Sequence, residues 1–503
     1  MNTNAETATA SSQIEQLSDA AREFVERAPH GSLIDNEWVA SENTFNTIDP
    51  STGGVLASVA NATQGHIDQA VAAARAAFDD SAWSAMTGAE RGELMNRFAD
   101  LIAENALELA ELEAIDNGKP VKLAQIVDVG NSVRHLRYFA GWASKLEGRT
   151  IPVGAPDTFV YTQRVPVGVC AQIIPWNFPL LMACWKLAPA LTTGCTVVLK
   201  PAEQTPLTAL RIGELAIEAG FPAGVINVVN GDGKVGAALV DHPGVNKIAF
   251  TGSTTVGREI GKKAGEALKR VTLELGGKSP NIIFDDADLK AAIGGSFQGI
   301  YYNTGQACNA GSRLFVQSSM FAEVTEQLAA LADKAVVGPS LDKSSRFGPV
   351  VSAEQFERVN QYIQIGIDEG AKPLAGGVAE ASDGGFFIAP TLFTDVDPGM
   401  RIAREEIFGP VLVATPFDSL EEVAAMANDH EYGLAAGLWT RDVGKAHKLA
   451  GMLQSGMVYI NMWGITDPGA PFGGVKASGI GREHGEENLD AYLETKTVWT
   501  SLN

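Results

Sequence analysis

The order of apolar segments between residues 167 and 277 constrains the fold of this 503-residue chain more than any other feature. Five short apolar runs alternate there with stretches of helical periodicity: VGVCAQIIP, CTVVLKP, GVINVVNG, NKIAFTGS and TLELGG. Runs of about four to eight apolar residues, many of them β-branched, are typical of parallel strands that crossover helices bury on both faces. The pattern therefore predicts a doubly wound sheet of the kind that binds dinucleotides.

Other regions predict further structural units around this sheet. Residues 281–459 repeat the α/β texture, whereas residues 63–117 have a helical periodicity that ends at a glycine and a proline, as helix stop signals predict. Residues 158–164 and 491–501 alternate apolar and polar side chains, as strands do, and could pair in a separate small sheet.

The amino terminus is expected to take no part in the chemistry. Residues 1–12 are rich in small polar residues and predict a mobile tail, and residues 14–27 predict a short amphipathic helix. No apolar segment of the kind found in secretory signals is present, and Lys186 and Pro189 interrupt the apolar stretch 178–199. We therefore expect neither export nor a membrane span.

Charge and cysteine usage exclude several classes of function. The chain has 38 basic and 60 acidic residues, a net charge of -22, without blocks of like charge or a Lys/Arg stripe. Nucleic acids and anionic membranes are therefore poor partners. The four cysteines show neither CxxC nor Cys/His spacing, so neither a disulfide framework nor a metal site is indicated, and a reducing cytoplasm fits.

Two glycine-containing segments could bind phosphate. GDGKVG, at residues 231–236, follows a predicted strand, but no acidic residue closes a second strand about 20 residues later, which favours a plain turn. In FTGSTTVGREIG a strand runs through Thr251, Gly252 and Ser253 into a helix, whose free N–H groups and positive dipole end favour a pyrophosphate. Alone, this segment could equally be an ordinary helix cap.

Three polar residues lie where they could act in catalysis. NTGQACNAGSR surrounds Cys308 with small neighbours that leave its sulfur accessible, although a lone cysteine is more often inert core. LELGGKSPN puts Glu274 at the end of an apolar run, either as a paired or solvated strand end or as a carboxylate whose partial burial raises its pKa toward that of a base. PWNFP holds Asn177 after a strand, where its amide could donate to an oxyanion or satisfy its own backbone.

The remaining polar candidates are equally open from the residues alone. KPAEQTP offers Lys200 and Glu203, which could hold ribose hydroxyls or be surface residues. Cys170, Cys184 and Cys195 lie within apolar patterns and are expected in the core. None of the seven histidines lies within the cysteine, glutamate or asparagine motifs, so a Cys–His hydrolase is less favoured.

Seven motifs occur together in an order and spacing that resemble the aldehyde dehydrogenase superfamily. They are PWNFP, KPAEQTP, FTGST, LELGGKSP, GQACNAGSR, EEIFGPV and PFGGVKASGIGRE, and the resemblance covers about residues 32–500. Each motif is weak alone, whereas their joint occurrence is specific. The resemblance overturns the assignment of Cys308 to the core.

The resemblance implies an α/β fold with a Rossmann-like cofactor domain, an α/β catalytic domain and a small β oligomerisation sheet. It also implies a homodimer or homotetramer, because that sheet pairs with another subunit in the family. The implied division is an amino-terminal tail and short helix in 1–30, an NAD-binding domain in 31–147 and 167–277, a catalytic domain in 278–486, and the bridging sheet in 148–166 and 487–503.

The family's catalytic roles carry over to three residues. Cys308 would be the nucleophile, Glu274 the general base, and the Asn177 amide with the Cys308 backbone N–H the oxyanion hole. Attack by the thiolate gives a thiohemiacetal whose negative oxygen needs preplaced donors, and hydride loss to the nicotinamide leaves a thioester that Glu274-activated water would hydrolyse. Glu483 matches a position proposed as an auxiliary base in the family.

The resemblance also implies the cofactor site and NAD as the cofactor, with NADP as an alternative. A carboxylate at Glu203 can accept hydrogen bonds from both ribose hydroxyls and would repel a 2'-phosphate, which favours NAD. The implied cofactor residues are Pro175 and Trp176, Lys200 and Glu203 at the adenosine ribose, Gly252 and Ser253 at the pyrophosphate, and Glu406 and Phe408 at the nicotinamide ribose; the resemblance gives Pro175 and Trp176 no particular part of the cofactor.

The substrate implied is a small-molecule aldehyde, which would enter an aromatic, apolar funnel. Such a funnel suits an aromatic or arylalkyl aldehyde such as phenylacetaldehyde, while betaine aldehyde in an aromatic cage and aliphatic aldehydes stay as alternatives. The matching positions are Phe178, Leu181, Met182, Trp185, Tyr302, Met462, Trp463 and Phe472.

Three other functions are compatible with parts of the sequence. A CoA-acylating relative shares the fold but transfers the thioester to CoA, whereas a Glu274 placed to activate water favours hydrolysis. A cysteine hydrolase would need no cofactor. A catalytically silent binding relative would lack the nucleophile, yet Cys308 is present.

Overall fold

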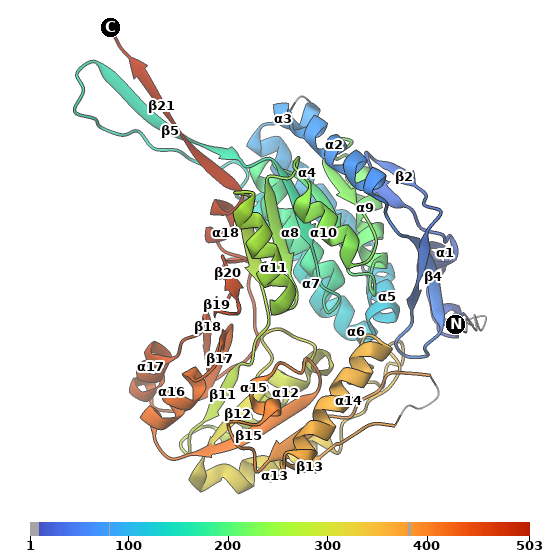
Figure 1. Ribbon diagram of the computed structural model, residues 1–503, viewed down its shortest axis with the longest axis vertical. Helices are drawn as coiled ribbons and strands as arrows, with labels where there is room; N and C mark the ends of the chain where they lie inside the picture. Colours follow the sequence, from blue (N-terminus) through green and yellow to red (C-terminus); the bar gives the residue numbers. More distant parts are fainter. Residues whose placement is uncertain (1–9, 80, 381–383) are drawn as a thin grey trace.

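Two α/β units and a thin two-stranded arm make up the protein. The computed structural model describes residues 10–79, 81–380 and 384–503. Figure 1 shows the two units end to end, with the arm extending from the first unit and carrying the C-terminus. Residues 1–9 of the predicted amino-terminal tail lie outside the described residues, and the helix expected over 14–27 is a 3-10 turn, Ile14–Gln16, followed by α1, Asp19–Glu26.

The first unit contains the doubly wound sheet, so the predicted fold class is confirmed. Its strands run in the order β2-β1-β8-β7-β6-β9-β10-β20, and the five predicted apolar runs are the parallel strands at its centre. Their bounds are β6 Val169–Ile173, β7 Thr196–Lys200, β8 Ile226–Val228, β9 Lys247–Thr251 and β10 Arg270–Glu274, with the antiparallel β1 Ser32–Ile34, β2 Glu37–Val39 and β20 Gly479–Ile480 at the edges.

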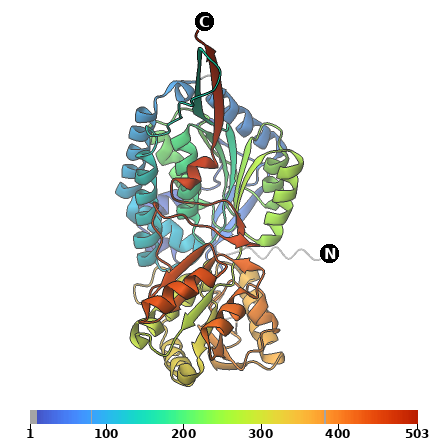
Figure 2. The ribbon, with the colours of Figure 1, turned by 90° about the vertical axis from the view of Figure 1, so that its left-hand side faces the viewer.

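Helices cover both faces of this sheet (Figure 2). Successive strand residues alternate between two cores: Cys170 packs in one, and Val169 and Ala171 pack in the other. This alternation explains why the strands are apolar throughout, since neither face meets water. One face carries α4 Gly88–Glu104, α5 Ala106–Asn117, α7 Gly130–Ala140, α8 Pro179–Thr193 and α9 Leu207–Ala219; the other carries α2 Gln64–Asp79, α10 Gly233–Asp241 and α11 Thr254–Glu266.

The second unit is a seven-stranded sheet in the order β13-β14-β15-β12-β11-β17-β18. Only β13 is antiparallel among these strands. The strands are β11 Pro280–Ile283, β12 Arg313–Gln317, β13 Lys372–Ala375, β14 Thr391–Thr394, β15 Val411–Phe417, β17 Ala435–Trp439 and β18 Met457–Ile460. Helices α12 Leu289–Tyr301 and α13 Phe321–Ala332 cover one face, and α14 Ala353–Asp368, α16 Leu420–Asn428 and α17 Val443–Met452 cover the other.

The arm is the pair of strands β5, Thr158–Pro166, and β21, Leu493–Ser501. They pair antiparallel along their whole length, from Leu493 opposite Pro166 to Ser501 opposite Thr158. Large side chains on the arm remain exposed, Trp499 by 63% and Phe159 by 43%. An isolated two-stranded ribbon is marginally stable in water, so its apolar side chains need a covering surface.

Local geometry distinguishes the two candidate phosphate segments. GDGKVG begins α10, where Asp232 caps the helix by accepting from the Lys234 N–H at 2.8 Å. FTGST joins β9 to α11, and Ser253 Oγ accepts from the Val256 N–H. Among the residues that the structure describes, no helix has both the length and the apolarity to cross a membrane.

Close packing of α11 on β10 predicts the effect of one substitution. A Cβ at Gly257 would lie 2.3 Å from Leu275 Cδ2, whereas a Cβ at Gly265 in the same helix would have no heavy atom within 4 Å. We expect Gly257→Ala to lower the free energy of unfolding by about 1–3 kcal/mol through overpacking. Gly265→Ala should leave it unchanged or raise it by up to about 1 kcal/mol. Urea unfolding of both variants measures the difference, and equal effects would contradict this packing.

Candidate active site

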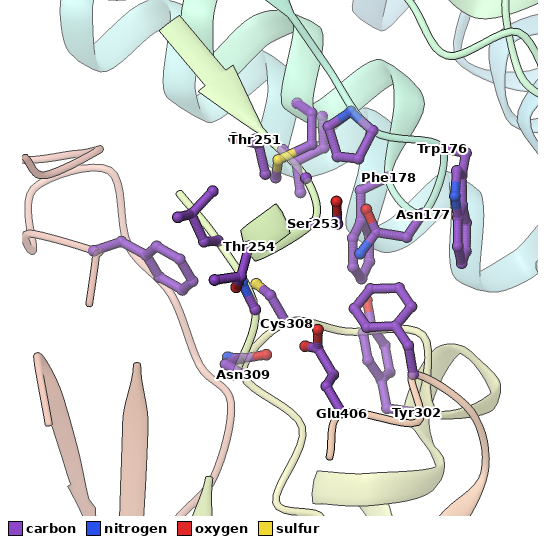
Figure 3. Close-up of a pocket in the computed structure, with 18 of the residues that line it drawn as sticks. Trp176, Asn177, Phe178, Thr251, Ser253, Thr254, Tyr302, Cys308, Asn309 and Glu406 are labelled. Atoms are coloured by element: carbon purple, nitrogen blue, oxygen red, sulfur yellow. The ribbon is translucent and has the colours of Figure 1, made fainter. Parts of the chain in front are cut away.

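A cavity of about 810 Å³ lies where the carboxyl ends of β6, β9 and β10 meet the second unit. Ligands of doubly wound sheets bind at this edge because the connecting loops and helix N-termini face it. The first unit supplies residues 175–178 and 251–255, and the second supplies Cys308 and the 405–408 segment. Figure 3 shows side chains of both units around the Cys308 sulfur.

The chain reverses sharply to bring Cys308 into the cavity. Helix α12 ends at Tyr301, and Asn303, Thr304 and Gly305 follow with φ of 49°, 54° and 73°. At Gly305 a Cβ would lie 2.1 Å from the Gly409 carbonyl oxygen, so only glycine fits there. The reversal leaves Cys308 on the cavity surface, partly exposed, while Cys170, Cys184 and Cys195 are buried.

Two glycines after Glu274 let the second unit approach the end of β10. A Cβ at Gly276 would lie 2.3 Å from Glu406 Oε2, and one at Gly277 would lie 2.5 Å from the Cys308 carbonyl oxygen. Instead, the Gly277 N–H donates to Glu406 Oε1 at 2.8 Å. The GG of LELGGK is therefore a contact surface for the segments that carry Cys308 and Glu406.

Although Cys308 is partly exposed as a residue, the protein atoms around its sulfur favour the protonated thiol at neutral pH. Burial raises the pKa of Cys308 to about 12, and the carboxyls of Glu274 and Glu406 add to this shift. Burial likewise raises the pKa of Glu406 to about 7, opposed by the Gly277 N–H. The thiolate that nucleophilic attack requires is thus a minor species in the ligand-free protein.

Asn177 joins the two units beside Cys308. Its side chain is buried, and Nδ2 donates to the Gln306 carbonyl at 2.9 Å. In return, Asn303 Nδ2 donates to the Asn177 carbonyl at 3.0 Å. Because a primary amide has two N–H groups, Asn177 retains a second donor for a ligand in the cavity.

Glu274 lies behind the cavity wall. It is the last residue of β10, is 4% exposed, and its Oε2 has no hydrogen-bond partner among the described residues. Burial and the Glu483 carboxyl raise the pKa of Glu274, while Lys186 and Arg482 lower it. Glu483 itself is paired with Lys186 at 2.8 Å. The raised pKa favours the protonated form of Glu274, whereas only its carboxylate can act as a base.

The predicted cofactor residues divide between the cavity and the loop after β7. Pro175, Trp176, Gly252, Ser253, Glu406 and Phe408 all line the cavity. Lys200 and Glu203 lie beyond it, where Lys200 Nζ contacts Glu203 Oε2 at 3.2 Å. The Lys200 side chain is 4% exposed and that of Glu203 is 41% exposed, so the carboxylate is accessible to a ligand.

Helix α14 contributes residues to the site that no motif indicated. Gln355 Nε2 donates to the Phe408 carbonyl at 2.7 Å, and Arg358 Nη2 donates to the Glu406 carbonyl at 2.8 Å. Both residues line the cavity with Tyr362. Their spacing of three and four residues along a helix was a signal that they share one face. Phe408, whose carbonyl accepts the Gln355 bond, has a left-handed conformation with φ of 62°.

Most of the predicted aldehyde funnel surrounds the other end of the cavity. Leu181, Met182 and Trp185 of α8 line it together with the aromatic side chains of Phe178, which precedes this helix, Tyr302 and Phe472. The structure places Met462 and Trp463 outside the lining. Trp463 instead packs against the glycines of β17 and the Cys308 loop, with Cζ3 2.3 Å from where a Gly437 Cβ would be. Gly464, Ile465 and Thr466 take their place, since the chain turns after Asn461.

Comparisons with known proteins identify relatives of the whole chain. Residues 38–498 match the model of the aldehyde dehydrogenase family. The human mitochondrial aldehyde dehydrogenase is 52% identical over 93% of this chain and 91% of its own length. A phenylacetaldehyde dehydrogenase of Pseudomonas fluorescens is 47% identical over 94% and 96%. The NAD⁺ complex of an aldehyde dehydrogenase from Bacillus cereus is 50% identical and superposes with a TM-score of 0.95, covering 97% of this chain and 99% of that one.

The raised pKa of Cys308 predicts how the thiol reacts with alkylating agents. We expect iodoacetamide to label Cys308 slowly at neutral pH, with a rate that rises about tenfold per pH unit up to the limit of native stability, because only the thiolate reacts. Mass spectrometry of the ligand-free protein measures the rate and the site. Cys308→Ser should take up no label while folded, since the other three cysteines are buried. A rate independent of pH above neutrality would contradict a protonated resting thiol.

Proposed function

The chain belongs to the aldehyde dehydrogenase family and oxidises aldehydes with NAD, and we propose that it does so through a covalent bond between the aldehyde carbon and Cys308. The observation that carries this proposal is the convergence of Cys308, Asn177 and Glu406 on one cavity from different units. Such a site holds a reacting carbon between nucleophile, oxyanion donor and cofactor segment.

Attack on the aldehyde begins with the thiolate of Cys308. The Cys308 sulfur bonds to the carbonyl carbon, and the carbonyl oxygen becomes a negative oxygen of a thiohemiacetal. The free N–H of the Asn177 amide and the Cys308 backbone N–H would donate to this oxygen. Preplaced donors of this kind contribute about 2.7–4 kcal/mol each when they meet charge in the transition state.

The residues present fit NAD. The first turn of α11 offers N–H groups and a positive dipole end to a pyrophosphate, and the Ser253 cap orients that turn. Glu406 would accept from the nicotinamide ribose, and the exposed Glu203 carboxylate with Lys200 would bind the adenosine ribose. When bound, NAD supplies the acceptor for the hydride of the thiohemiacetal carbon. The Glu203 carboxylate disfavours a 2'-phosphate, so we propose NAD rather than NADP as the preferred cofactor.

Glu274 would then supply the base for hydrolysis of the Cys308 thioester. As a carboxylate turned toward the cavity, it would take a proton from the attacking water and release the carboxylic acid. Its raised pKa makes this step faster as the pH rises, because the fraction of carboxylate increases. A base dedicated to water favours a hydrolytic enzyme over a CoA-acylating one.

We propose an aromatic or arylalkyl aldehyde, such as phenylacetaldehyde, as the substrate. Phe178 and Tyr302 stack with centroids 5.9 Å apart, and Trp185 meets Phe472 edge to face at 5.1 Å. These rings provide a flat, apolar wall that suits a phenyl group. The likeness to the phenylacetaldehyde dehydrogenase of Pseudomonas fluorescens supports the same choice. Betaine and aliphatic aldehydes stay as alternatives.

The arm supports a proposal about assembly. Its exposed Trp499 and Phe159 would be covered if β5 and β21 joined a sheet of another copy, which would give the homodimer or homotetramer expected from the family. A cytoplasmic location stays a prediction from cysteine usage.

The catalytic roles predict distinct kinetic failures in two variants. We expect Cys308→Ser to lose nearly all NADH formation while it still binds NAD, because no thiohemiacetal forms. Glu274→Gln should release about one NADH per site in a burst and then turn over about 10²–10⁴-fold more slowly, because the thioester accumulates. Stopped-flow absorbance with and without CoA measures both phases. Full steady-state turnover by Glu274→Gln would refute its role.

The aromatic wall predicts the order of substrates. We expect kcat/KM for phenylacetaldehyde to exceed that for an aliphatic aldehyde of similar length by about 10-fold or more, because stacking in the transition state adds about 1.5 kcal/mol. Betaine aldehyde should be poorer still. Steady-state NADH formation across this panel tests the order, and a preference for betaine aldehyde would replace the proposed substrate class.

A further inference from the structure

The carboxyl end of α5 forms hydrogen bonds with the segment that carries Asn177. Asn117 Nδ2 donates to the Trp176 carbonyl at 2.7 Å, one residue before Asn177. Glu113 Oε2 accepts from the Leu180 N–H at 3.2 Å, three residues after it. The backbone of residues 176–180 is therefore anchored on both sides of the amide that faces Cys308.

Lys119 makes a third contact with this segment, at the Phe178 ring that lines the aldehyde site. Gly118 ends α5 with φ of 92° and turns the chain back, which buries the Lys119 side chain completely. Its Nζ lies 4.3 Å from the centroid of the Phe178 ring. An ammonium over an aromatic face is attracted to it, by about 2 kcal/mol or more when it is desolvated.

Two buried carboxyls hold the Lys119 ammonium in place. Nζ lies 2.7 Å from Asp128 Oδ1 and 3.3 Å from Glu113 Oε1, and all three side chains are fully buried. Burial raises the pKa of Glu113 to about 8 and also raises that of Asp128, and the nearby Lys119 opposes both shifts. Glu113 also accepts from Thr208 Oγ1 at 3.3 Å, which ties the cluster to α9.

Stability alone gives a poor account of such a cluster. Replacing buried ion pairs by apolar side chains of similar volume is often neutral or stabilising. The polar arrangement instead provides specific contacts with one segment. The Glu113 and Asn117 hydrogen bonds and the Lys119 ammonium all contact residues 176–180. The opposite side of that segment faces the Cys308 loop, where Asn177 Nδ2 bonds the Gln306 carbonyl and Asn303 Nδ2 bonds the Asn177 carbonyl.

We propose that Lys119, Glu113 and Asn117 are positioning residues that set the distance between the Asn177 amide and Cys308, and that Lys119 does so through its contact with the Phe178 ring. This proposal rests on the proposed function, since it needs Asn177 to stabilise the oxyanion. A shift of about 1 Å in a preplaced group can cost about 10²-fold in rate, so small movements of the 176–180 backbone are sufficient.

The proposal is tested by comparing the effect of Lys119→Met on the rate of NADH formation when Asn177 is present and when it is replaced by alanine. Lys119→Met removes the ammonium but keeps the length of the side chain. In the otherwise native enzyme we expect the rate of NADH formation in a single turnover, which reports attack and hydride loss and is called the burst rate below, to fall about tenfold or more. The Kd for NAD and the rate of thioester hydrolysis should stay within about twofold. In an Asn177→Ala background, Lys119→Met should change the burst rate by less than about twofold, because coupled residues are not additive.

A matched control removes a different ion pair of helix α5. Arg211 on α9 holds Glu108, in the first turn of α5, through contacts of 2.7 and 3.1 Å. Arg211→Met removes an ion pair of α5 that does not touch residues 176–180, so it should alter unfolding but leave the burst rate unchanged. If Lys119→Met fails to fold, Asn117→Ala can replace it, because it removes only the hydrogen bond to the Trp176 carbonyl. Its burst rate is then compared in the native and Asn177→Ala backgrounds.

Three outcomes decide between the possibilities. Losses of equal size in the native and Asn177→Ala backgrounds would show that Lys119 acts on general structure and would overturn the proposal. An unchanged burst rate in Lys119→Met would overturn it as well. A native enzyme that forms no NADH from any aldehyde would instead refute the proposed function itself, before either variant is compared.

Discussion

The close approach of the second unit to the end of β10 is the constraint on which the site depends. Gly276 and Gly277 leave no side chain between β10 and the segments that carry Glu406 and Cys308. Because of this contact, the Gly277 N–H can bind Glu406, and the Cys308 loop can reach the Asn177 turn of the first unit. The nucleophile and its oxyanion donor thus come from different sheets, and their distance is set by backbone contact rather than by flexible side chains.

Buried ionisable groups surround this contact, and burial raises the pKa of each acidic group among them. The pKa values of Cys308, Glu274 and Glu406 are all raised, so burial favours the protonated form of each group before ligands bind. A site in this state is less costly to bury than one with three adjacent anions. Its reactive forms must be produced during the catalytic cycle, when bound ligands change the surroundings of each group.

Much of the fold could be predicted from the sequence because its strands are apolar on both faces. VGVCAQIIP and the four runs after it became the five central parallel strands. The joint motifs also indicated Cys308, Asn177 and part of the cavity lining. The positions of Arg358 and Trp463 could not be predicted in this way, because each depends on a contact with a segment far away in the chain. Arg358 contacts the Glu406 carbonyl and Trp463 packs on Gly437 of β17. Helical spacing indicates that Arg358 shares a face with its neighbours in α14, but neither segment indicates what it contacts. The burial of Glu274 behind Gly473 likewise depends on residues far away in the chain.

The division of the cavity between two sheets has a consequence for the loss of activity under stress. Each unit has its own hydrophobic cores and can keep its secondary structure when the contact between them loosens. A separation of about 1 Å would part the Asn177 turn from the Cys308 loop and Gly277 from Glu406 together. We therefore expect mild heat or denaturant to inactivate the protein by loosening this contact before either sheet unfolds, and expect activity to return while both cores persist.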